Sequence, residues 1–409
     1  MFFSDNFLPD NFLKCRYMAQ CSGCQIAHLD PTAQIDFKKN KFIDLWKKTF
    51  SVVPEIEFRR PIESQFRDRV DLTVQRPTIQ HDAISNSSEC EQEYQKLGFY
   101  KKDSRDILDI ESCPLMSKGT SDFYTEVRKV HFPIQKGSLR IRVSPGGKRG
   151  IWLDFSNEDI KKLLEEKNTL IELTKICDVI EIGQKRKRLS QVEGQFKLTA
   201  PESIAWFETY DKNLNPIELK MNVGSFSQTG FKTNKALISE LFKVLNPNFN
   251  NQVQNQIHDQ KWIELCSGSG NLTFPLLSLF SNVIATELDE NAVESLRTTA
   301  KNLNLSERLQ VEQINIHKPS QKLEDLLSGV DGILADPPRS GLQGFLEVIS
   351  KLPKEKIPKK FVYVSCFAET LISDLKTLSD LGYKPNKIIG IDQFPHSTHC
   401  EWIVNLSRD

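Results

Sequence analysis

The chain has 409 residues, with 54 basic and 54 acidic side chains, so its formal net charge is zero. This length predicts two or three domains, and the balanced charge excludes a protein that binds nucleic acid through overall charge, so any basic surface must be local. No apolar run approaches the roughly 20 residues of a membrane-spanning helix. The first residues are acidic rather than basic, unlike those of a signal peptide. We therefore expect a cytoplasmic protein without a membrane partner.

Three cysteines form a tight group near the N-terminus: Cys15, Cys21 and Cys24. In a reducing compartment, clustered cysteines indicate a metal centre or catalysis rather than disulfides. A tetrahedral zinc or an iron–sulfur cluster needs a fourth ligand, and the candidates are His28, Cys90 and Cys113. We prefer Cys113, because Pro114 follows it as in some cluster sequences, whereas Cys90 lies in a polar stretch typical of a surface loop. Spacing alone leaves zinc and iron–sulfur open.

The region after this group predicts one helix and then antiparallel strands. Residues 30–50 predict an amphipathic helix whose inner face carries Ile35, Phe42, Ile43 and Trp46. Apolar and polar residues then alternate, as in strands with one solvated face. These strands are expected at 69–74, 96–100, 107–110, 139–144 and 150–155.

A basic run at 185–188 accompanies strands that carry Arg140 and Arg142. Runs of charge are usually solvated surface. Beside these strands, the run is also a candidate phosphate-binding face.

The pattern changes after about residue 225, where strands alternate with helices as in a parallel sheet. A polar loop at 246–260 precedes a strand that contains Glu264 and ends in a turn with Gly268 and Gly270, and Asn271 follows. A second strand ends at Glu287, roughly 20 residues on, the placement that lets a carboxylate bind a ribose diol. The segment has no third glycine of the dinucleotide pattern and no phosphate-binding lysine, so the pocket suits S-adenosylmethionine, a nucleoside without a pyrophosphate.

Three later segments carry polar groups to the same edge of the sheet. A strand at 330–335 ends at Asp336, and two prolines hold Asp336 and Arg339 in a rigid exit. A strand at 360–365 gives way to a helix at Cys366, where the helix N-terminus would lower the pKa of a thiol and make it a nucleophile; a buried structural cysteine is the alternative. Glu401 opens the final strand, and taken alone it is an ordinary strand-end charge.

Together these motifs resemble the RNA uracil-5 methyltransferases, the group that makes 5-methyluridine in ribosomal and transfer RNA. The resemblance covers nearly the whole chain, including the Asp-Pro-Pro-Arg-x-Gly motif at 336–341 and the Phe-x-Gln motif at 226–228, with Asn234 after it. It implies Cys366 as nucleophile and Glu401 as base. It implies a 4Fe–4S cluster on Cys15, Cys21, Cys24 and Cys113. It implies a donor site formed by Gln228, Glu264, Gly268, Gly270, Asn271, Glu287 and Asp336.

The sequence also departs from the family. Phe367-Ala368 stands where the family usually has Asn-Pro after the nucleophile, and Gly230 replaces an Asn that usually follows the Gln. Only 14 residues precede Cys15, so we expect that the N-terminal RNA-binding barrel of many relatives is absent. The chain is most like the shorter 23S ribosomal RNA enzymes, since the transfer-RNA branch usually lacks the cluster.

The resemblance implies two regions: an iron–sulfur and β-rich RNA-binding region at 1–225 and a Rossmann-like α/β methyltransferase domain at 226–409, on which helix 30–50 could pack. The expected activity is methylation of uridine C5 through a covalent bond between Cys366 and C6, by a monomer acting on RNA. Methylation of transfer RNA, a small-molecule methyltransferase and a non-catalytic RNA-binding protein are the alternatives.

Overall fold

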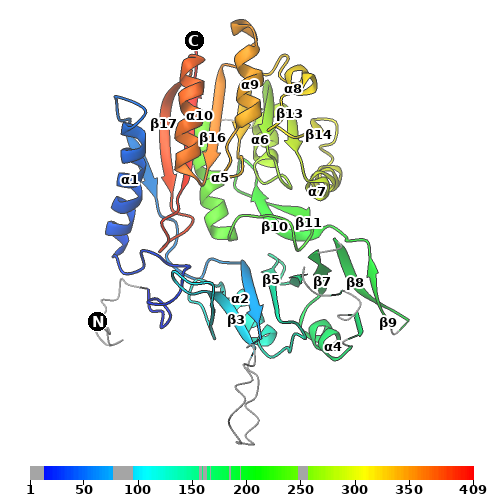
Figure 1. Ribbon diagram of the computed structural model, residues 1–409. Coiled ribbons are helices and arrows are strands. Elements are labelled where there is room, and N and C mark those ends of the chain that lie inside the picture. The colour runs from blue at the N-terminus through cyan, green and yellow to red at the C-terminus, as the bar shows by residue number, and fades with distance from the viewer. Residues whose placement is uncertain are drawn as a thin grey trace, which may run out of the picture. The chain divides into compact units, whose positions relative to one another are not determined.

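The computed structural model describes residues 13–76, 95–155, 159, 164–165, 167–183, 186–193, 195–246 and 257–409. The chain forms two compact units (Figure 1). The first, here the β-rich unit, comprises residues 1–28 and 64–202, and the second, here the α/β unit, comprises 29–63 and 203–409. This division differs from the boundary expected at residue 225. Within the described residues, no helix combines the length and apolar character needed to cross a bilayer.

The β-rich unit is built on one eight-stranded sheet with the order β4-β3-β2-β5-β6-β7-β8-β9. All neighbours are antiparallel except β6 and β7. The strands are β2 (Arg69–Gln75), β3 (Lys96–Tyr100), β4 (Ile107–Asp109), β5 (Lys136–Val143), β6 (Arg149–Asp154), β7 (Val179–Ile182), β8 (Lys187–Val192) and β9 (Gln195–Thr199). The five strands predicted from alternation are all present, with ends no more than three residues from those expected.

Two helices of the β-rich unit, α2 (Lys118–Val127) and α4 (Lys167–Ile176), pack on β5 and β7. Their buried residues, including Phe123, Tyr124 and Leu170, share one apolar core with the inward side chains of the strands. Of the basic run at 185–188, Lys187 and Arg188 begin β8, and residue 185 lies outside the described residues.

The α/β unit contains a second eight-stranded sheet, with the order β1-β17-β18-β16-β15-β12-β13-β14. β18 is antiparallel to both neighbours and the other pairs are parallel. The strands are β1 (Ile56–Arg59), β12 (His258–Leu265), β13 (Phe280–Glu287), β14 (Leu309–Gln313), β15 (Gly332–Ala335), β16 (Lys360–Ser365), β17 (Lys384–Ile391) and β18 (Glu401–Ser407). The predicted loop at 246–260 therefore ends earlier, since β12 begins at His258; residues 247–256 lie outside the description.

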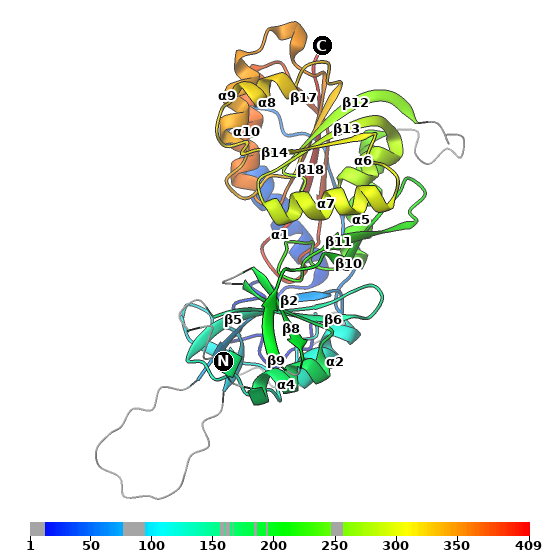
Figure 2. The same ribbon diagram turned by 90° about the vertical axis from the view of Figure 1, so that its right-hand side faces the viewer.

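Helices cover both faces of this sheet, which Figure 2 shows close to edge-on. One face packs against α1 (Pro31–Lys47), α8 (Gln321–Leu326), α9 (Gln343–Lys351) and α10 (Ala368–Asp380) in a continuous apolar core. The other helices of the unit are α5 (Phe231–Leu245), α6 (Thr273–Leu279) and α7 (Glu290–Asn302). This is the doubly wound α/β architecture, whose ligands bind at the carboxyl ends of the strands.

The hairpin of β10 (Ile204–Tyr210) and β11 (Pro216–Met221) explains why the α/β unit begins at Ser203 rather than near 225. Alternation made these residues resemble the preceding strands, but their partners belong to the second unit. The Lys220 amide donates to Thr299 on α7 over 2.9 Å, and the Thr209 hydroxyl donates to the Asn271 carbonyl over 2.6 Å. Likewise, residues 29–63 join the α/β unit because α1 packs on α10 and β1 pairs with β17.

Candidate active site

The glycine turn between β12 and α6 forms a space beside the end of β13. Gly268 and Gly270 both adopt positive φ, of 54° and 100°. At Gly270 a Cβ atom would lie 2.6 Å from Leu296 and Phe274, so this glycine is required by packing. At Gly268 no atom lies within 4 Å of such a Cβ, so its missing side chain leaves room for a ligand to approach the backbone.

Glu287 points back at this turn from the end of β13. Its Oε2 accepts from the Gly268 amide over 2.9 Å, and its Oε1 accepts from the amides of Leu288 and Asp289 over 2.6 and 2.8 Å. Backbone donors therefore fix the carboxylate beside the open side of Gly268.

Two of the predicted donor-site residues lie behind the turn. Glu264 is 1% exposed and accepts from the Thr273 hydroxyl over 2.5 Å, and burial raises its pKa well above the usual range. The Asn271 and Asn234 amides donate to each other over 2.9 and 2.8 Å. These side chains are occupied by protein partners, so they shape the loop. Gln228 is buried in the segment that precedes α5.

The strand register brings Cys366 level with Glu401. Ser365 at the end of β16 pairs with Trp402 on the antiparallel β18. In an antiparallel pair the numbering runs in opposite directions, so Cys366 lies opposite Glu401. Asp336 follows β15, the other neighbour of β16, and its amide donates to the Leu265 carbonyl over 3.2 Å. The sheet thus gathers a thiol and two carboxyl groups at its carboxyl edge.

These three groups act on one another electrostatically. Asp336 as a whole is partly exposed to solvent, but protein atoms surround its carboxyl group. This desolvation raises the pKa of Asp336 to about 7. Burial, together with the Asp336 charge, raises the pKa of Glu401 well above its usual range. Two adjacent carboxyl groups resist losing both protons, so the pair retains a proton more readily than isolated acids.

The thiol of Cys366 differs from its prediction. The N-terminus of α10 is beside it, but burial raises its pKa to about 11, and the charges of Glu401 and Asp336 oppose ionisation further. Arg339 acts in the opposite direction. The predicted lowering of this pKa is therefore wrong, because desolvation and two carboxylates outweigh the helix dipole.

Asp374 on α10 is a positioning residue that the sequence analysis missed. Its Oδ2 accepts from the Tyr363 hydroxyl over 2.6 Å and from the Leu342 amide over 2.8 Å. It thereby ties the Asp-Pro-Pro-Arg loop to β16. At Gly341 φ is 74°, and a Cβ would lie 2.5 Å from Asp374 Oδ2, which explains the glycine of this motif. The available signal was an aspartate among the apolar residues of one face of an amphipathic helix.

A second missed group is a buried polar network between α1 and the loop that leads to Glu401. Lys38 Nζ donates to Asp392 Oδ1 over 2.6 Å and to the Phe394 carbonyl over 2.9 Å, and both charged side chains are 0% exposed. Arg60 Nη1 lies 3.4 Å from the other Asp392 oxygen. This network fixes the entry to the loop at 392–400.

His396 belongs to the same network and occupies a left-handed conformation with φ of 68°. Its amide donates to Gln34 Oε1 over 3.0 Å, and its Nε2 lies 2.9 Å from the Glu63 carbonyl oxygen. The buried face of α1 is the row Gln34, Lys38, Phe42 and Trp46. The predicted face included the two isoleucines instead, because apolarity alone could not indicate that polar residues at this spacing would be buried.

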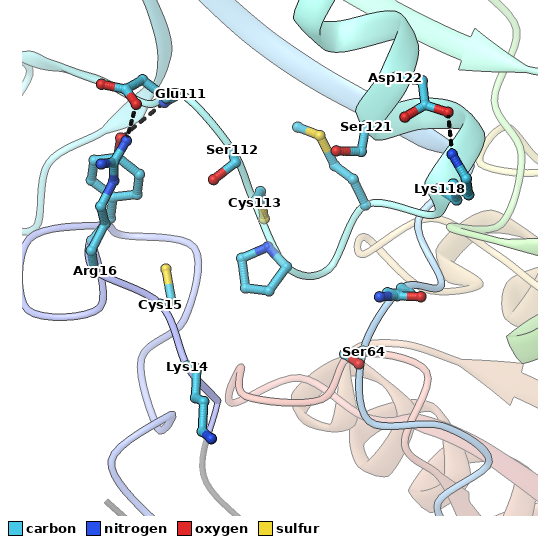
Figure 3. Close-up of a pocket in the computed structure, with 14 residues that line it drawn as sticks. Lys14, Cys15, Arg16, Ser64, Glu111, Ser112, Cys113, Lys118, Ser121 and Asp122 are labelled. Atoms are coloured by element: carbon cyan, nitrogen blue, oxygen red, sulfur yellow. Dashed lines mark hydrogen bonds and ion pairs between the residues drawn. The ribbon is translucent and has the colours of Figure 1, made fainter. Parts of the chain in front are cut away.

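The N-terminal cysteines lie in the β-rich unit, anchored to the β3–β4 hairpin. The Ser22 amide donates to the Tyr100 carbonyl over 3.1 Å, and the Lys102 amide donates to the Gln20 carbonyl over 2.7 Å. The Glu111 amide donates to the Tyr17 hydroxyl over 2.9 Å, which holds the segment of Cys15 beside that of Cys113. Both cysteines line an open pocket of about 770 Å³ (Figure 3).

All four predicted ligand cysteines are neighbours. Burial raises the pKa of the Cys24 thiol to about 12, with contributions from the thiols of Cys113, Cys21 and Cys15, whereas Arg67 acts to lower it. Within the described part of the chain, no three His, Cys, Asp or Glu side chains converge as a single bound ion would require. His28 is exposed, and Cys90 lies outside the described residues.

Comparison with known proteins places these sites in a family. The model of the family described as tRNA (Uracil-5-)-methyltransferase matches residues 216–409. An uncharacterized RNA methyltransferase of Bdellovibrio bacteriovorus is 34% identical over 97% of this chain and 95% of its own length. The 23S rRNA (uracil(1939)-C(5))-methyltransferase RlmD of Neisseria lactamica is 26% identical over 96% of this chain and 81% of its own.

The crystal structure of Pyrococcus abyssi tRNA (uracil-54, C5)-methyltransferase in complex with S-adenosyl-L-homocysteine has the same fold. It superposes with a TM-score of 0.63 and 21% identity, over 94% of this chain and 86% of that one. The whole-length similarity to an RNA methyltransferase, together with the matched family and the RlmD relatives, identifies the chain as a member of the RNA uracil-5 methyltransferases.

Proposed function

We propose that the protein methylates C5 of one uridine in 23S ribosomal RNA, with S-adenosylmethionine as donor and Cys366 as covalent nucleophile. The observation that carries this proposal is the meeting of Cys366, Glu401 and Asp336 at the edge of the sheet that also bears the Gly268–Glu287 turn. The RlmD relatives support ribosomal RNA as target. A transfer RNA is the alternative, which the fold shared with a tRNA enzyme supports.

The donor would bind beside Gly268. Glu287 is already held by three backbone amides, so a ribose diol would meet a carboxylate that does not have to reorganise. Bound there, the donor supplies the methyl group. Gln228 and Asp336 would orient the uracil or the donor from the adjacent loops.

Covalent catalysis makes C5 reactive. The thiolate of Cys366 adds to C6, and the electron pair of the C5–C6 bond moves to C5, which becomes enolate-like and takes the methyl group. A base then removes the C5 proton, and elimination of the thiolate restores the double bond. Glu401 is our base: burial raises its pKa, and a carboxylate of higher pKa accepts a proton more readily. The target base must leave its stack to expose C6.

We further propose a 4Fe–4S cluster on Cys15, Cys21, Cys24 and Cys113. Four thiols that act on one another electrostatically support this proposal, because a 4Fe–4S cluster takes four cysteine ligands. Iron–sulfur clusters carry out redox chemistry in many proteins, but here these cysteines would fix the loop at 13–28 against the hairpin and shape the RNA-binding surface.

The direct test maps 5-methyluridine in the RNA of a strain with and without this chain. Loss of one modified position in 23S RNA, restored by the chain and not by Cys366→Ala, is the expected result. Loss of 5-methyluridine from transfer RNA alone would show that the substrate is a transfer RNA. Methylation of free metabolites, with none in RNA, would contradict the proposal.

A further inference from the structure

Phe367, the residue in which this chain departs from the usual Asn after the nucleophile, makes a specific contact. It is the N-cap residue of α10 and is partly buried. The Arg339 guanidinium lies over its ring, with Cζ 5.6 Å from the ring centroid. The ring therefore links the loop of the thiol to the loop that follows β15.

This contact places the positively charged Arg339 near the thiol of Cys366. The groups that face Cys366 come from three elements: Asp336 and Arg339 after β15, Glu401 at the start of β18, and the N-terminus of α10. The two carboxyl groups oppose a thiolate and Arg339 favours it. Arg339 also acts electrostatically on His399, so its charge is directed at the site although the residue is exposed.

A long exposed side chain does not keep one position unless a contact holds it, because ordering it costs conformational entropy. Asp374 fixes the backbone near Gly341, but not the Arg339 side chain. The Phe367 ring supplies the missing contact, since a guanidinium within about 6 Å of an aromatic face is attracted by it.

We propose that Phe367 is a positioning residue that holds the Arg339 guanidinium beside Cys366, and that Arg339 stabilises the thiolate that adds to uracil. The addition of this thiolate to uracil rests on the proposed function, whereas the stabilisation of the thiolate by Arg339 can be measured without it. The aromatic side chain thus gives the unusual Phe367-Ala368 sequence a role in activating the nucleophile.

The experiment follows alkylation of Cys366 by iodoacetamide against pH, in the full-length protein without RNA or donor, and quantifies the Cys366 peptide by mass spectrometry. Only the thiolate reacts, so the rate should rise tenfold per pH unit up to about 11. At pH 8, Phe367→Leu should slow alkylation about two- to fivefold, the range of a cation–π contact at an exposed site. Arg339→Gln should slow it at least as much.

Two further variants separate positioning from packing. Phe367→Trp keeps an aromatic face and should retain the parental rate. Phe367→Leu added to Arg339→Gln should have no further effect, because the ring acts only through the guanidinium. The proposal is overturned if Phe367→Leu alone leaves alkylation unchanged, or if its effect persists without Arg339. The partly buried thiol of Cys177, in the other unit, is the internal standard. Transfer of a labelled methyl group to RNA is measured separately, so failure of the proposed function would be seen independently.

Discussion

The two cysteine sites of this protein set the same side chain in opposite surroundings. At the edge of the α/β sheet, the thiol of Cys366 faces two carboxyl groups and one guanidinium. In the β-rich unit, the thiols of Cys15, Cys21 and Cys24 lie near that of Cys113, which follows β4, with Arg67 nearby. Burial raises the pKa of the thiols at both sites, but the partner that would stabilise a thiolate differs between them. The first site needs a transient partner, a positioned cation or the substrate, whereas the second needs a permanent one, which a bound iron cluster would supply.

Separating the chemical steps is the strongest way to test the single-thiol site. Cys366→Ala removes the nucleophile and should abolish both RNA adduct and product, a loss on the order of 10⁴-fold or more. Glu401→Gln removes only the later base, so it should still add the thiol and transfer the methyl group. It should then remain attached to RNA, as a slow band in denaturing electrophoresis that carries donor label. If this variant binds RNA and donor yet gives neither adduct nor product, Glu401 acts earlier or only structurally.

Metal content tests the four-thiol site. Anaerobically purified protein should be brown and contain about four irons per chain, as the cluster requires. Cys113→Ser should lose iron as severely as Cys21→Ser, because each would remove one of four ligands. Cys177→Ser, in the same unit, is the matched control and should keep the iron. A colourless protein with one zinc would refute the cluster, and iron loss in Cys90→Ser would show that the fourth ligand is wrong.

Two substitutions on α1 test how much the buried pair of Lys38 and Asp392 contributes to the stability of the α/β unit. Lys38→Met leaves the buried Asp392 carboxylate without its closest partner, and breaking a buried pair in this way costs about 3–5 kcal/mol of unfolding free energy. Lys41→Met removes an exposed pair with Glu369 and should cost at most about 1 kcal/mol. Denaturant unfolding of both variants measures the difference. Equal small losses would mean that the network does not hold the loop at 392–400.

The smallest expected effect concerns the donor. Glu287→Ala removes a charge-assisted hydrogen bond to the ribose, worth roughly 1.5–3 kcal/mol, and should weaken binding of S-adenosylmethionine by about 10- to 150-fold. Calorimetry without RNA measures this directly. Glu290→Ala, at the exposed first residue of α7, is a suitable control. Unchanged affinity in Glu287→Ala would remove this residue from the donor site.

The sequence predicted those parts of the molecule that depend on local pattern. Alternation located β2 to β6 of the β-rich unit but not β7, β8 and β9, and strand ends located Glu287, Asp336 and Cys366 at one edge. The sequence did not predict contacts between residues that are far apart in the chain. The β10–β11 hairpin alternates like its predecessors but packs on α7, and Lys38 looks like a surface lysine until Asp392 lies beside it. The raised pKa of Cys366 likewise comes from burial and then from the charges of Glu401 and Asp336, which the strand register brings close.

The edge strand β1 has a consequence for how the protein is made. Ile56 pairs with Ile388, so this strand leaves the ribosome long before its partner is synthesised, and residues 64–202 of the β-rich unit are translated between them. Contacts so distant in the chain close slowly, because loop entropy must be overcome first. We expect the β-rich unit to fold as a nascent chain. The catalytic edge would then assemble only once β17 and β18 have left the ribosome, and until then α1 and β1 would stay exposed to chaperones.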